Sequence, residues 1–379
     1  MTARPRRGRL LLTSHYFHPH VGGIETVLKA HAEGLVRRGW DVTICTSRLR
    51  GDERTEAHVG ATVRRTRAWN VLERSVRVPV PLVSPTQLLA MREARPEVIV
   101  AHGHTYLSSV YAALAARLLR VPLVVVQHSP WVEYPFPLDV VERIADRSIG
   151  RFVLHSATEV VVVSGFTGAF VAEIAPRAAL QVVYSGVDAR YRPTPPREGP
   201  QRLRVATLRR LVPRQGVDVL IDAWRSARCG DVADLSIGGD GPERDALVAR
   251  AGGDPSIGFL GRVPDAEMES FYSACDVFVL PTSSGEGFGL VAAEALASGR
   301  PVIATRPGGP SELVRDGVDG LLVDASDSAG LGAALRSLLE DEPRRVAMSS
   351  RAAERDLSWT RAIDEIERVL DAVRRPAGD

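Results

Sequence analysis

The stretch DVFVLPTSSGEGFGLVAAEALASGRPVIAT (Asp276–Thr305) reads as a strand, a loop, a helix and a second strand. We expect the helix to begin near Phe288 or Gly289 and to end at Gly299. Glycines at the loop positions let the backbone approach a ligand closely, and the free N–H groups of the helix start form an anion site. The stretch therefore predicts a site for phosphate or for sugar hydroxyls.

Two glutamates, Glu286 and Glu294, lie eight positions apart in this stretch. Helical side chains tilt towards the helix N-terminus, so the carboxylate of Glu294 can reach back towards a ligand held by the glycine loop. Carboxylate oxygens accept hydrogen bonds from neighbouring hydroxyls. The alternative is a surface glutamate on an amphipathic helix. Alanines surround Glu294, and an unpaired buried charge is costly, so we favour ligand binding.

Short runs rich in β-branched residues recur through the first half of the chain, and several are separated by segments with helical apolar spacing. The expected strands are RLLLTS, DVTICT, EVIVAH, PLVVVQH and EVVVVS, and the expected helices include Ile24–Arg38 and Tyr106–Leu119. Near-continuous apolar strands that alternate with helices indicate a parallel sheet covered on both faces. The first half therefore predicts a doubly wound α/β domain.

The second half repeats this plan after a proline- and arginine-rich boundary near residues 187–201. Its expected strands are LRVATL, ADLSIGG, DVFVLP, RPVIAT and GLLV, and its expected helices are GVDVLIDAWRSA, PERDALVARA, DAEMESFYSA and GLVAAEALAS. We predict domains at 1–186 and 187–358. A further helix is expected in the segment 359–379, and the pattern does not fix where it docks, the first domain being one option. Ligands bind at the carboxyl ends of such strands, which predicts a central cleft that both domains face.

The composition is that of a globular enzyme, with 379 residues, 45% hydrophobic and 25% charged. Three separated cysteines argue against a disulfide framework, and no apolar run is long enough for a signal peptide or a membrane helix. We therefore expect a cytoplasmic protein. Residues 1–190 carry a net charge of +8 and the remainder −6. This basic first half favours an anionic partner, such as a phosphate-bearing acceptor or the inner face of a membrane, although an ordinary solvated surface explains it equally well.

The motif EGFGLVxxEAxAxGxPVIAT resembles the signature of glycosyltransferase family 4, whose members are retaining enzymes with the two-domain GT-B fold. Further matching segments are RPGGPSELVRDGVDGLLV, YFHPHVGGIETVLKAHAEGLVRRGWDVTICTS, VVYSGVDARYRP, GGDGPERDAL and FLGRVPDAEMESFYSACDVFVLPT. The resemblance covers most of the chain. It implies a nucleoside-diphosphate sugar as donor substrate, with uridine, guanosine and adenosine all open as the base, no separate cofactor, and an acceptor with a free hydroxyl. It also implies that the first domain binds the acceptor and the second the nucleotide sugar.

The resemblance also assigns roles to matching positions. As catalytic residues it implies Glu286 on the sugar hydroxyls, His128 beside the transferred sugar and Arg210 at the diphosphate. As substrate-binding residues it implies Gly22, Gly23, Arg214, Gln215, Arg262, Val263, Gly287, Phe288, Gly289, Leu290, Val291 and Glu294, with Glu294 on the ribose and Arg262 and Val263 near the base. Independently of the family, His128 ends a buried strand at the edge where ligands bind, although a histidine satisfied in the core fits equally well.

One departure from the family pattern concerns the positive charge that the leaving diphosphate needs. The family run G-R-L-x-x-x-K-G appears here as LRRLVPRQG, so Gln215 replaces the lysine and Arg209 replaces the first glycine. Three interpretations remain open. Arg214 or Arg209 supplies the charge, the glutamine suffices with slower chemistry, or the protein binds the nucleotide sugar without efficient turnover. Because Lys29 is the chain's single lysine, we favour compensation by Arg214.

Rival functions are distinguished by other features of the sequence. A GT-B sugar-nucleotide epimerase would form an epimer without any acceptor, and a nucleotide-sugar-binding protein would bind without turnover. A dinucleotide oxidoreductase lacks its expected glycine motif, and nothing indicates nucleic acid. The histidines of the groups 15–20 and 102–104 are interpreted as lining the cleft rather than holding a metal. Segments 64–83 and 131–152 combine arginine, aromatic residues and proline, and are candidates for acceptor or lipid contact, with ordinary loops as the simpler alternative.

Overall fold

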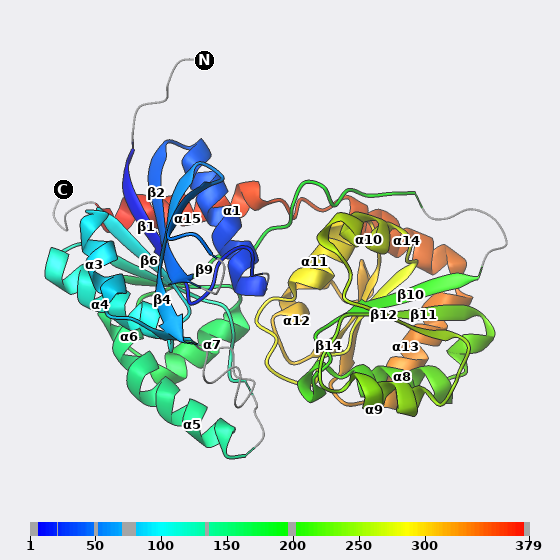
Figure 1. Ribbon diagram of the computed structural model, residues 1–379. Helices are drawn as coiled ribbons and strands as arrows, with labels where there is room; N and C mark the ends of the chain where they lie inside the picture. The colour runs from blue at the N-terminus through cyan, green and yellow to red at the C-terminus, as the bar shows by residue number, and fades with distance from the viewer. Residues whose placement is uncertain are drawn as a thin grey trace. The chain divides into compact units, whose positions relative to one another are not determined.

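The computed structural model describes residues 7–20, 22–48, 52–69, 81–132, 136–195 and 202–374. The chain divides into two compact units (Figure 1). The first domain comprises Met1–Pro130, Tyr134–Ser185 and Trp359–Asp379, and the second comprises Trp131–Glu133 and Gly186–Ser358. Residues 196–201 of the expected boundary segment lie outside the described residues. Each domain is a parallel sheet between helices, so the predicted pair of Rossmann-like α/β domains is confirmed.

The sheet of the first domain has its helical crossovers on both sides. Its order is β3 (Thr55–His58), β4 (Ala61–Trp69), β2 (Trp40–Arg48), β1 (Gly8–Thr13), β6 (Val98–His102), β7 (Leu123–Gln127), β8 (Glu159–Val162) and β9 (Leu180–Val182), with β5 (Leu82–Val83) beside β4. The strands are parallel except β3 and β5, which run antiparallel to β4. The chain order reverses between β1 and β6, which makes that pair the topological switch point where α/β sheets bind ligands.

Helices of the first domain cover this sheet. They are α1 (Gly23–Arg37), α3 (Thr86–Glu93), α4 (Leu107–Leu119), α5 (Leu138–Ala145), α6 (Arg151–Ser156) and α7 (Gly165–Ile174), with a π-helical turn η1 (Asp146–Gly150) joining α5 to α6. The apolar faces of α1 and of the central strands form one buried core, which contains Leu28, Leu35 and Val100.

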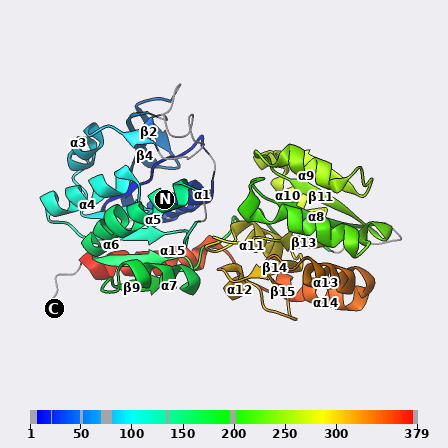
Figure 2. The same ribbon diagram turned by 90° about the horizontal axis from the view of Figure 1, so that it is seen from below.

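The C-terminal helix α15 (Trp359–Arg374) packs on the first domain against α1 (Figure 2). Its apolar face contributes Ile363 and Ile366 to the first-domain core. A Cβ on Gly34 of α1 would lie 2.6 Å from Ile363, so a glycine is needed for this close approach. Arg38 donates to Glu367 of α15 at 2.9 Å. The chain therefore returns to its first domain after completing the second.

The second domain contains a six-stranded parallel sheet. Its order is β12 (Ile257–Gly261), β11 (Ala233–Gly238), β10 (Leu203–Leu208), β13 (Val277–Leu280), β14 (Val302–Arg306) and β15 (Gly320–Asp324). The helices are α8 (Val217–Ser226), α9 (Arg244–Ala251), α10 (Met268–Ser273), α11 (Leu290–Ala297), α12 (Pro310–Leu313), α13 (Ser328–Glu340) and α14 (Glu342–Ala353). Figure 1 shows α8 and α13 on one side of this sheet and α11 with α14 on the other. Here the order reverses between β10 and β13, which places the switch point at their carboxyl ends.

Candidate active site

The loops that follow β10 and β13 meet at the switch point of the second domain. The two strands pair in parallel, with Val205 opposite Val277, so both loops leave the same edge of the sheet. The backbone N–H and the hydroxyl of Ser283 each donate to the Arg214 carbonyl at 3.0 Å. A Cβ on Gly216 would lie 1.8 Å from the Pro281 carbonyl oxygen, so only glycine allows the loops to pack this closely.

The glycine loop leads directly into α11. The helix begins at Leu290, and Gly289 precedes it with a φ of 90°, a left-handed conformation that favours glycine. The expected start near Phe288 or Gly289 is therefore off by one or two residues, because Gly289 is the N-cap. The N-terminus of α11 follows this loop directly, and the first N–H groups of an α-helix are not used by the helix itself. This arrangement suits an anionic or hydroxyl-rich ligand.

The side chain of Glu286 is held by an arginine from the neighbouring strand end. An Nη of Arg209 donates to Glu286 at 2.6 Å and to the Thr282 hydroxyl at 2.9 Å. The Arg209 side chain is 6% exposed and that of Glu286 is 21% exposed. The backbone N–H of Gly309 donates to the Glu286 carbonyl at 3.1 Å. The carboxylate is thus fixed at the loop yet open to solvent.

Three other polar residues of the LRRLVPRQG run occupy different environments. Arg210 is exposed, Arg214 is half-buried and Gln215 is buried. An Nη of Arg214 lies 3.5 Å from the position of a Cβ on Gly285, which places this guanidinium beside the glycine loop. Arg209, which directly follows β10, is the arginine of this run that contacts Glu286.

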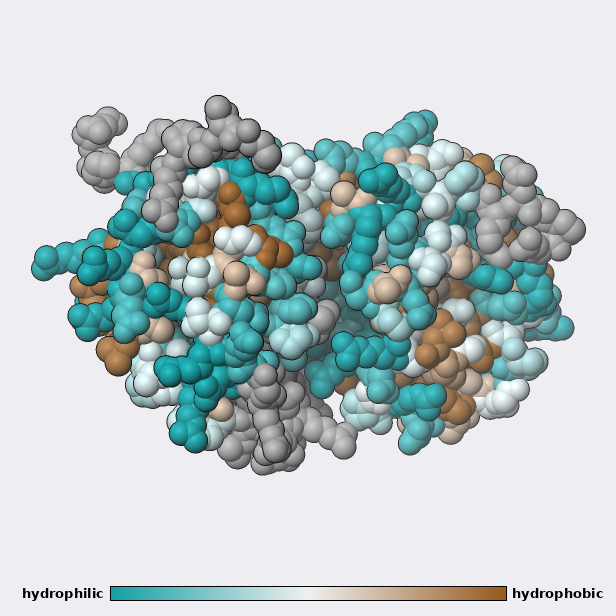
Figure 3. All heavy atoms as spheres, turned by 45° about the horizontal axis from the view of Figure 1, so that its top comes forward, coloured by the Kyte–Doolittle hydropathy of each residue, from teal (hydrophilic) through white to brown (hydrophobic). Residues whose placement is uncertain are grey.

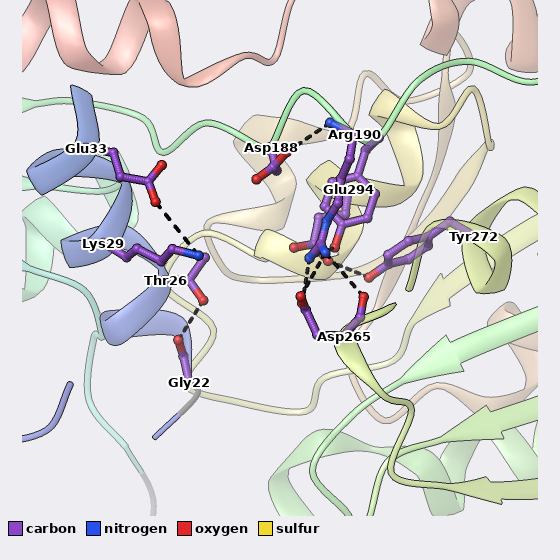
Figure 4. A network of polar contacts seen from close by, with 10 residues as sticks. Gly22, Thr26, Lys29, Glu33, Asp188, Arg190, Asp265, Tyr272 and Glu294 are labelled. Carbon is purple, nitrogen blue, oxygen red and sulfur yellow. Dashed lines mark hydrogen bonds and ion pairs between the residues drawn. The ribbon is translucent and has the colours of Figure 1, made fainter. Parts of the chain in front are cut away.

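Glu294 lies on α11 and is held by a tyrosine (Figure 4). The hydroxyl of Tyr272 donates to the Glu294 carboxylate at 2.6 Å. Burial raises the pKa of Glu294 to about 7, and the hydrogen bond from Tyr272 opposes this shift. Nearby, Arg190 forms a two-pronged ion pair with Asp265 at 2.6 and 2.9 Å. Glu294 is thus a half-buried acceptor whose charge depends on pH near neutrality.

Arg262 and Val263 follow β12 and border a cavity of about 480 Å³. Residues of β10, β11, β12 and α10 also line this cavity, among them Phe271. Gly238, at the end of β11, leaves room here, because a Cβ on it would lie 3.0 Å from Val263. The cavity is large enough for a heterocyclic base, and its assignment to the donor base stays a prediction.

In the first domain, the predicted glycines stand at the start of α1. Gly22 is the N-cap residue of α1, and its carbonyl accepts the backbone N–H of Thr26 at 3.0 Å and the Thr26 hydroxyl at 2.9 Å (Figure 4). Gly23 is the first helical residue and is exposed. Lys29 lies one turn further along and pairs with Glu33 at 3.8 Å. Gly22 and Gly23 thus stand at the start of α1, and their contact with the diphosphate stays a prediction.

His128 follows β7 and belongs to a group of histidines packed inside the first domain. An Nδ1 of His102 lies 3.0 Å from Nε2 of His128, and the two rings stack with centroids 5.1 Å apart. His31 of α1 approaches His102 at 5.4 Å between ring centroids. Burial lowers the pKa of His31 to about 4 and that of His128 to about 3. These imidazoles are therefore neutral at pH 7.

The histidine groups at 15–20 and 102–104 lie in different environments, and His18 is exposed. His15, His102 and His104 are buried within the first domain, and His104 lies 2.9 Å from Asp146. His15 stacks on Tyr106 with ring centroids 3.8 Å apart. Among the described residues, no group of three or more histidine, cysteine, aspartate or glutamate side chains is arranged to hold a metal ion.

The fold and this site define a glycosyltransferase of the GT-B class. Similar solved structures are a sucrose-phosphate synthase from Thermosynechococcus elongatus (TM-score 0.81, 20% identity, 97% of this chain and 99% of that chain) and Anabaena HepE in complex with UDP and glucose (TM-score 0.74, 22% identity, 97% and 100%). At these identities the likeness establishes the fold.

The chain belongs to glycosyltransferase family 4. The family model "Glycosyltransferase Family 4" matches residues 21–191, and "Glycosyl transferases group 1" matches residues 195–355. A GDP-mannose-dependent alpha-(1-6)-phosphatidylinositol monomannoside mannosyltransferase of Mycolicibacterium smegmatis is 32% identical over 89% of this chain and 91% of its own length. A D-inositol 3-phosphate glycosyltransferase of Corynebacterium kroppenstedtii is 40% identical over 35% of this chain and 30% of its own. The predicted family and enzyme class are thus confirmed.

Proposed function

We propose that this enzyme is a retaining glycosyltransferase that moves a sugar from a nucleoside-diphosphate sugar to an acceptor hydroxyl, with GDP-mannose as the first donor to test. The observation that carries the proposal is the pair of carboxylates at one switch point, with Glu286 in the glycine loop and Glu294 on the helix that follows. The Mycolicibacterium smegmatis relative supports the donor, because it is named as GDP-mannose-dependent.

In this proposal the residues of the second domain divide the donor between them. Glu286 accepts a hydroxyl of the transferred sugar, Glu294 accepts the ribose hydroxyls, and the N-terminus of α11 faces the phosphate. Because Gln215 is uncharged, Arg210 and Arg214 supply the positive charge for the departing diphosphate. The roles of His128, Gly22, Gly23, Arg262 and Val263 towards the donor stay predictions.

The chemistry of retention needs no protein nucleophile. The acceptor oxygen forms a bond to the anomeric carbon on the face from which the phosphate oxygen leaves, and the acceptor proton passes to that phosphate oxygen. The protein orients the sugar, excludes water and stabilises the diphosphate charge. We propose that this chemistry proceeds without a metal ion, because the arginines and the start of α11 supply the positive charge.

A donor panel tests the function. The purified enzyme is incubated with GDP-mannose, UDP-glucose and ADP-glucose, and binding, nucleotide release and product configuration are followed by calorimetry, mass spectrometry and NMR. We expect GDP-mannose to bind most tightly and the transferred sugar to keep its α configuration. Binding without turnover over a broad acceptor panel would instead favour a nucleotide-sugar-binding protein, and an epimer formed without acceptor would favour the epimerase.

We also propose that the first domain contacts anionic lipid through α5 and its flanking residues. Helix α5 contains no buried residue, and its exposed apolar side chains include Val141 (59%) and Ile144 (63%). Phe136, just before the helix, is 85% exposed. Exposed arginines stand at positions 143, 147 and 151, and Arg147 pairs with Glu173 at 3.3 Å. An amphipathic helix of this kind suits the surface of an anionic membrane.

Two further observations bear on this lipid contact. No helix in the described part of the chain is long and apolar enough to cross a membrane. The face seen in Figure 3 is mostly hydrophilic, with hydrophobic side chains in small groups. Residues 70–80 of the candidate segment 64–83 lie outside the described residues. Of the two candidate segments, 64–83 and 131–152, the lipid proposal therefore rests on the second, which contains the exposed apolar helix α5.

A vesicle-binding experiment tests the lipid contact. The double variant Val141→Asp/Ile144→Asp is expected to bind vesicles of phosphatidylcholine and phosphatidylinositol about tenfold more weakly than the wild type, because charges enter the apolar face. Binding of the wild type should also weaken with added salt. Leu118→Asp, at an exposed leucine of α4, serves as the control and should leave binding unchanged. If the wild type, the double variant and Leu118→Asp sedimented equally with the vesicles, α5 would be excluded as the lipid contact.

A further inference from the structure

Arg209 is the residue of the site that the family pattern does not explain. The pattern has glycine at this position, whereas this chain carries an arginine that is 8% exposed. It follows β10, and its side chain donates to two residues that follow β13, Thr282 and Glu286. The side chain therefore bridges the two strand ends that form the switch point.

The contact with Glu286 determines what the charge of Arg209 can do. A buried guanidinium is costly unless an anion pairs with it, and the 2.6 Å contact to Glu286 provides that anion. The pair has no net charge, so Arg209 does not replace the missing lysine at Gln215. Of the two arginines considered for that role, Arg214 is the one whose guanidinium lies beside Gly285.

The contact also determines the orientation of Glu286. Arg209 holds one carboxylate oxygen, Oε2, while the backbone N–H of Gly309 holds the carbonyl of the same residue. In the described part of the chain, no residue donates to the other oxygen, Oε1, and the side chain remains 21% exposed. A glutamate side chain has three rotatable bonds, and the Nη of Arg209 that contacts both Glu286 and Thr282 restricts them.

We propose that Arg209 is a positioning residue that holds Glu286 by Oε2 and directs Oε1 at a hydroxyl of the transferred sugar. The inference rests on the proposed function, in that it requires Glu286 to contact the sugar of a nucleotide sugar. In this proposal, Arg209 of the second domain acts on the donor sugar only through the side chain of Glu286. The glycine of the family pattern has no side chain to do this.

Four proteins test the role of Arg209: wild type, Arg209→Gly, Arg209→Lys and the surface control Arg250→Gln. The assay uses whichever of GDP-mannose, UDP-glucose and ADP-glucose the wild type turns over fastest, together with its free nucleoside diphosphate. We expect Arg209→Gly to lower kcat at least tenfold and to change the Kd of the free diphosphate less than twofold. Arg209→Lys should recover part of kcat, and Arg250→Gln, which breaks an exposed pair with Asp222, should match the wild type.

A double-mutant cycle separates positioning from a general structural role. Because Arg209 acts through Glu286, Arg209→Gly should cost less than twofold in kcat when Glu286→Gln is already present. Thermal unfolding of each variant shows whether it is folded. If Arg209→Gly does not fold, Arg209→Lys and Arg209→Gln carry the same cycle.

The outcomes distinguish this inference from the proposed function. Wild-type turnover with an Arg209→Gly variant of equal kcat overturns the role of Arg209 and leaves the function standing. Full additivity in the cycle overturns it as well. If the wild type binds a nucleotide sugar without transferring it, the ratio of the Kd for the nucleotide sugar to the Kd for the free diphosphate replaces kcat as the measure. A ratio that is unchanged in Arg209→Gly overturns the inference. A wild type that binds none of the three nucleotide sugars overturns both.

Discussion

Replacement of Glu286 by glutamine is expected to lower kcat about a hundredfold and to change the donor Kd less than about threefold. The amide has the size of the carboxylate and keeps an oxygen that can accept from Arg209, so the loop is expected to retain its shape. What it lacks is the negative charge beside the sugar, which gains positive charge as the glycosidic bond breaks. That interaction strengthens in the transition state, so its loss appears in kcat and not in binding. Steady-state kinetics and calorimetry on one preparation measure both quantities.

Glu294→Gln is the matched variant on the helix that follows the loop, and its pattern should be the reverse. We expect the nucleotide Kd to weaken about tenfold while kcat at saturating donor stays within about twofold, since the ribose does not take part in bond breaking. Wild-type nucleotide binding should also weaken as the pH falls from 8 to 6, because the raised pKa of Glu294 lies at about 7. Glutamine should remove this pH dependence.

Two results would contradict these assignments. An unchanged kcat in Glu286→Gln would remove this residue from the sugar, and an unchanged nucleotide Kd in Glu294→Gln would remove that residue from the ribose. Melting temperatures check that both variants are folded, which matters for Glu286→Gln because the guanidinium of Arg209 then loses its charged partner.

Most of the parallel strands could be predicted from the sequence because each is a short apolar run. The expected LRVATL coincides with β10, and the helix expected within 359–379 is observed as α15 (Trp359–Arg374). Strands β3, β4, β5, β9 and β12 were not predicted, because they are short or are interrupted by charged residues or glycine. The docking of α15 could not be predicted either, since it depends on Gly34, a residue more than 300 positions away.

The site was predictable where its residues share one local motif. Glu286 and Glu294 stand in one loop and helix, so helical geometry alone brings them towards one ligand. Their partners come from elsewhere in the chain. Arg209 is separated from Glu286 by 77 positions and Tyr272 from Glu294 by 22. The replacement of a glycine by Arg209 was a visible signal, but its contact became apparent only when β10 was found beside β13.

The first domain is expected to lose stability steeply as the pH falls below about 6.5, because it buries several neutral histidines. Burial lowers the pKa of His15 and His31 to about 4 and of His128 to about 3, and that of His102 lies well below its usual value. The unfolded chain takes up these protons near pH 6.5 and the folded chain does not. Stability is therefore fully present above pH 6.5 and declines as the pH falls towards 4, by about 1.4 kcal/mol per pH unit for each histidine.

The variant His31→Leu tests this dependence directly. It removes one of the titrating groups from a site that is 4% exposed, so the proton uptake on unfolding should fall by about one and the acid-unfolding midpoint should move to lower pH. Urea unfolding followed by circular dichroism at pH 5, 6 and 7 gives the slope of the unfolding free energy against pH. His155→Gln changes an exposed histidine of α6 and should leave that slope unaltered. An equal slope in His31→Leu and the wild type would mean that His31 keeps its proton in the folded domain. A positive charge would then be buried beside His102 and its neighbour His128.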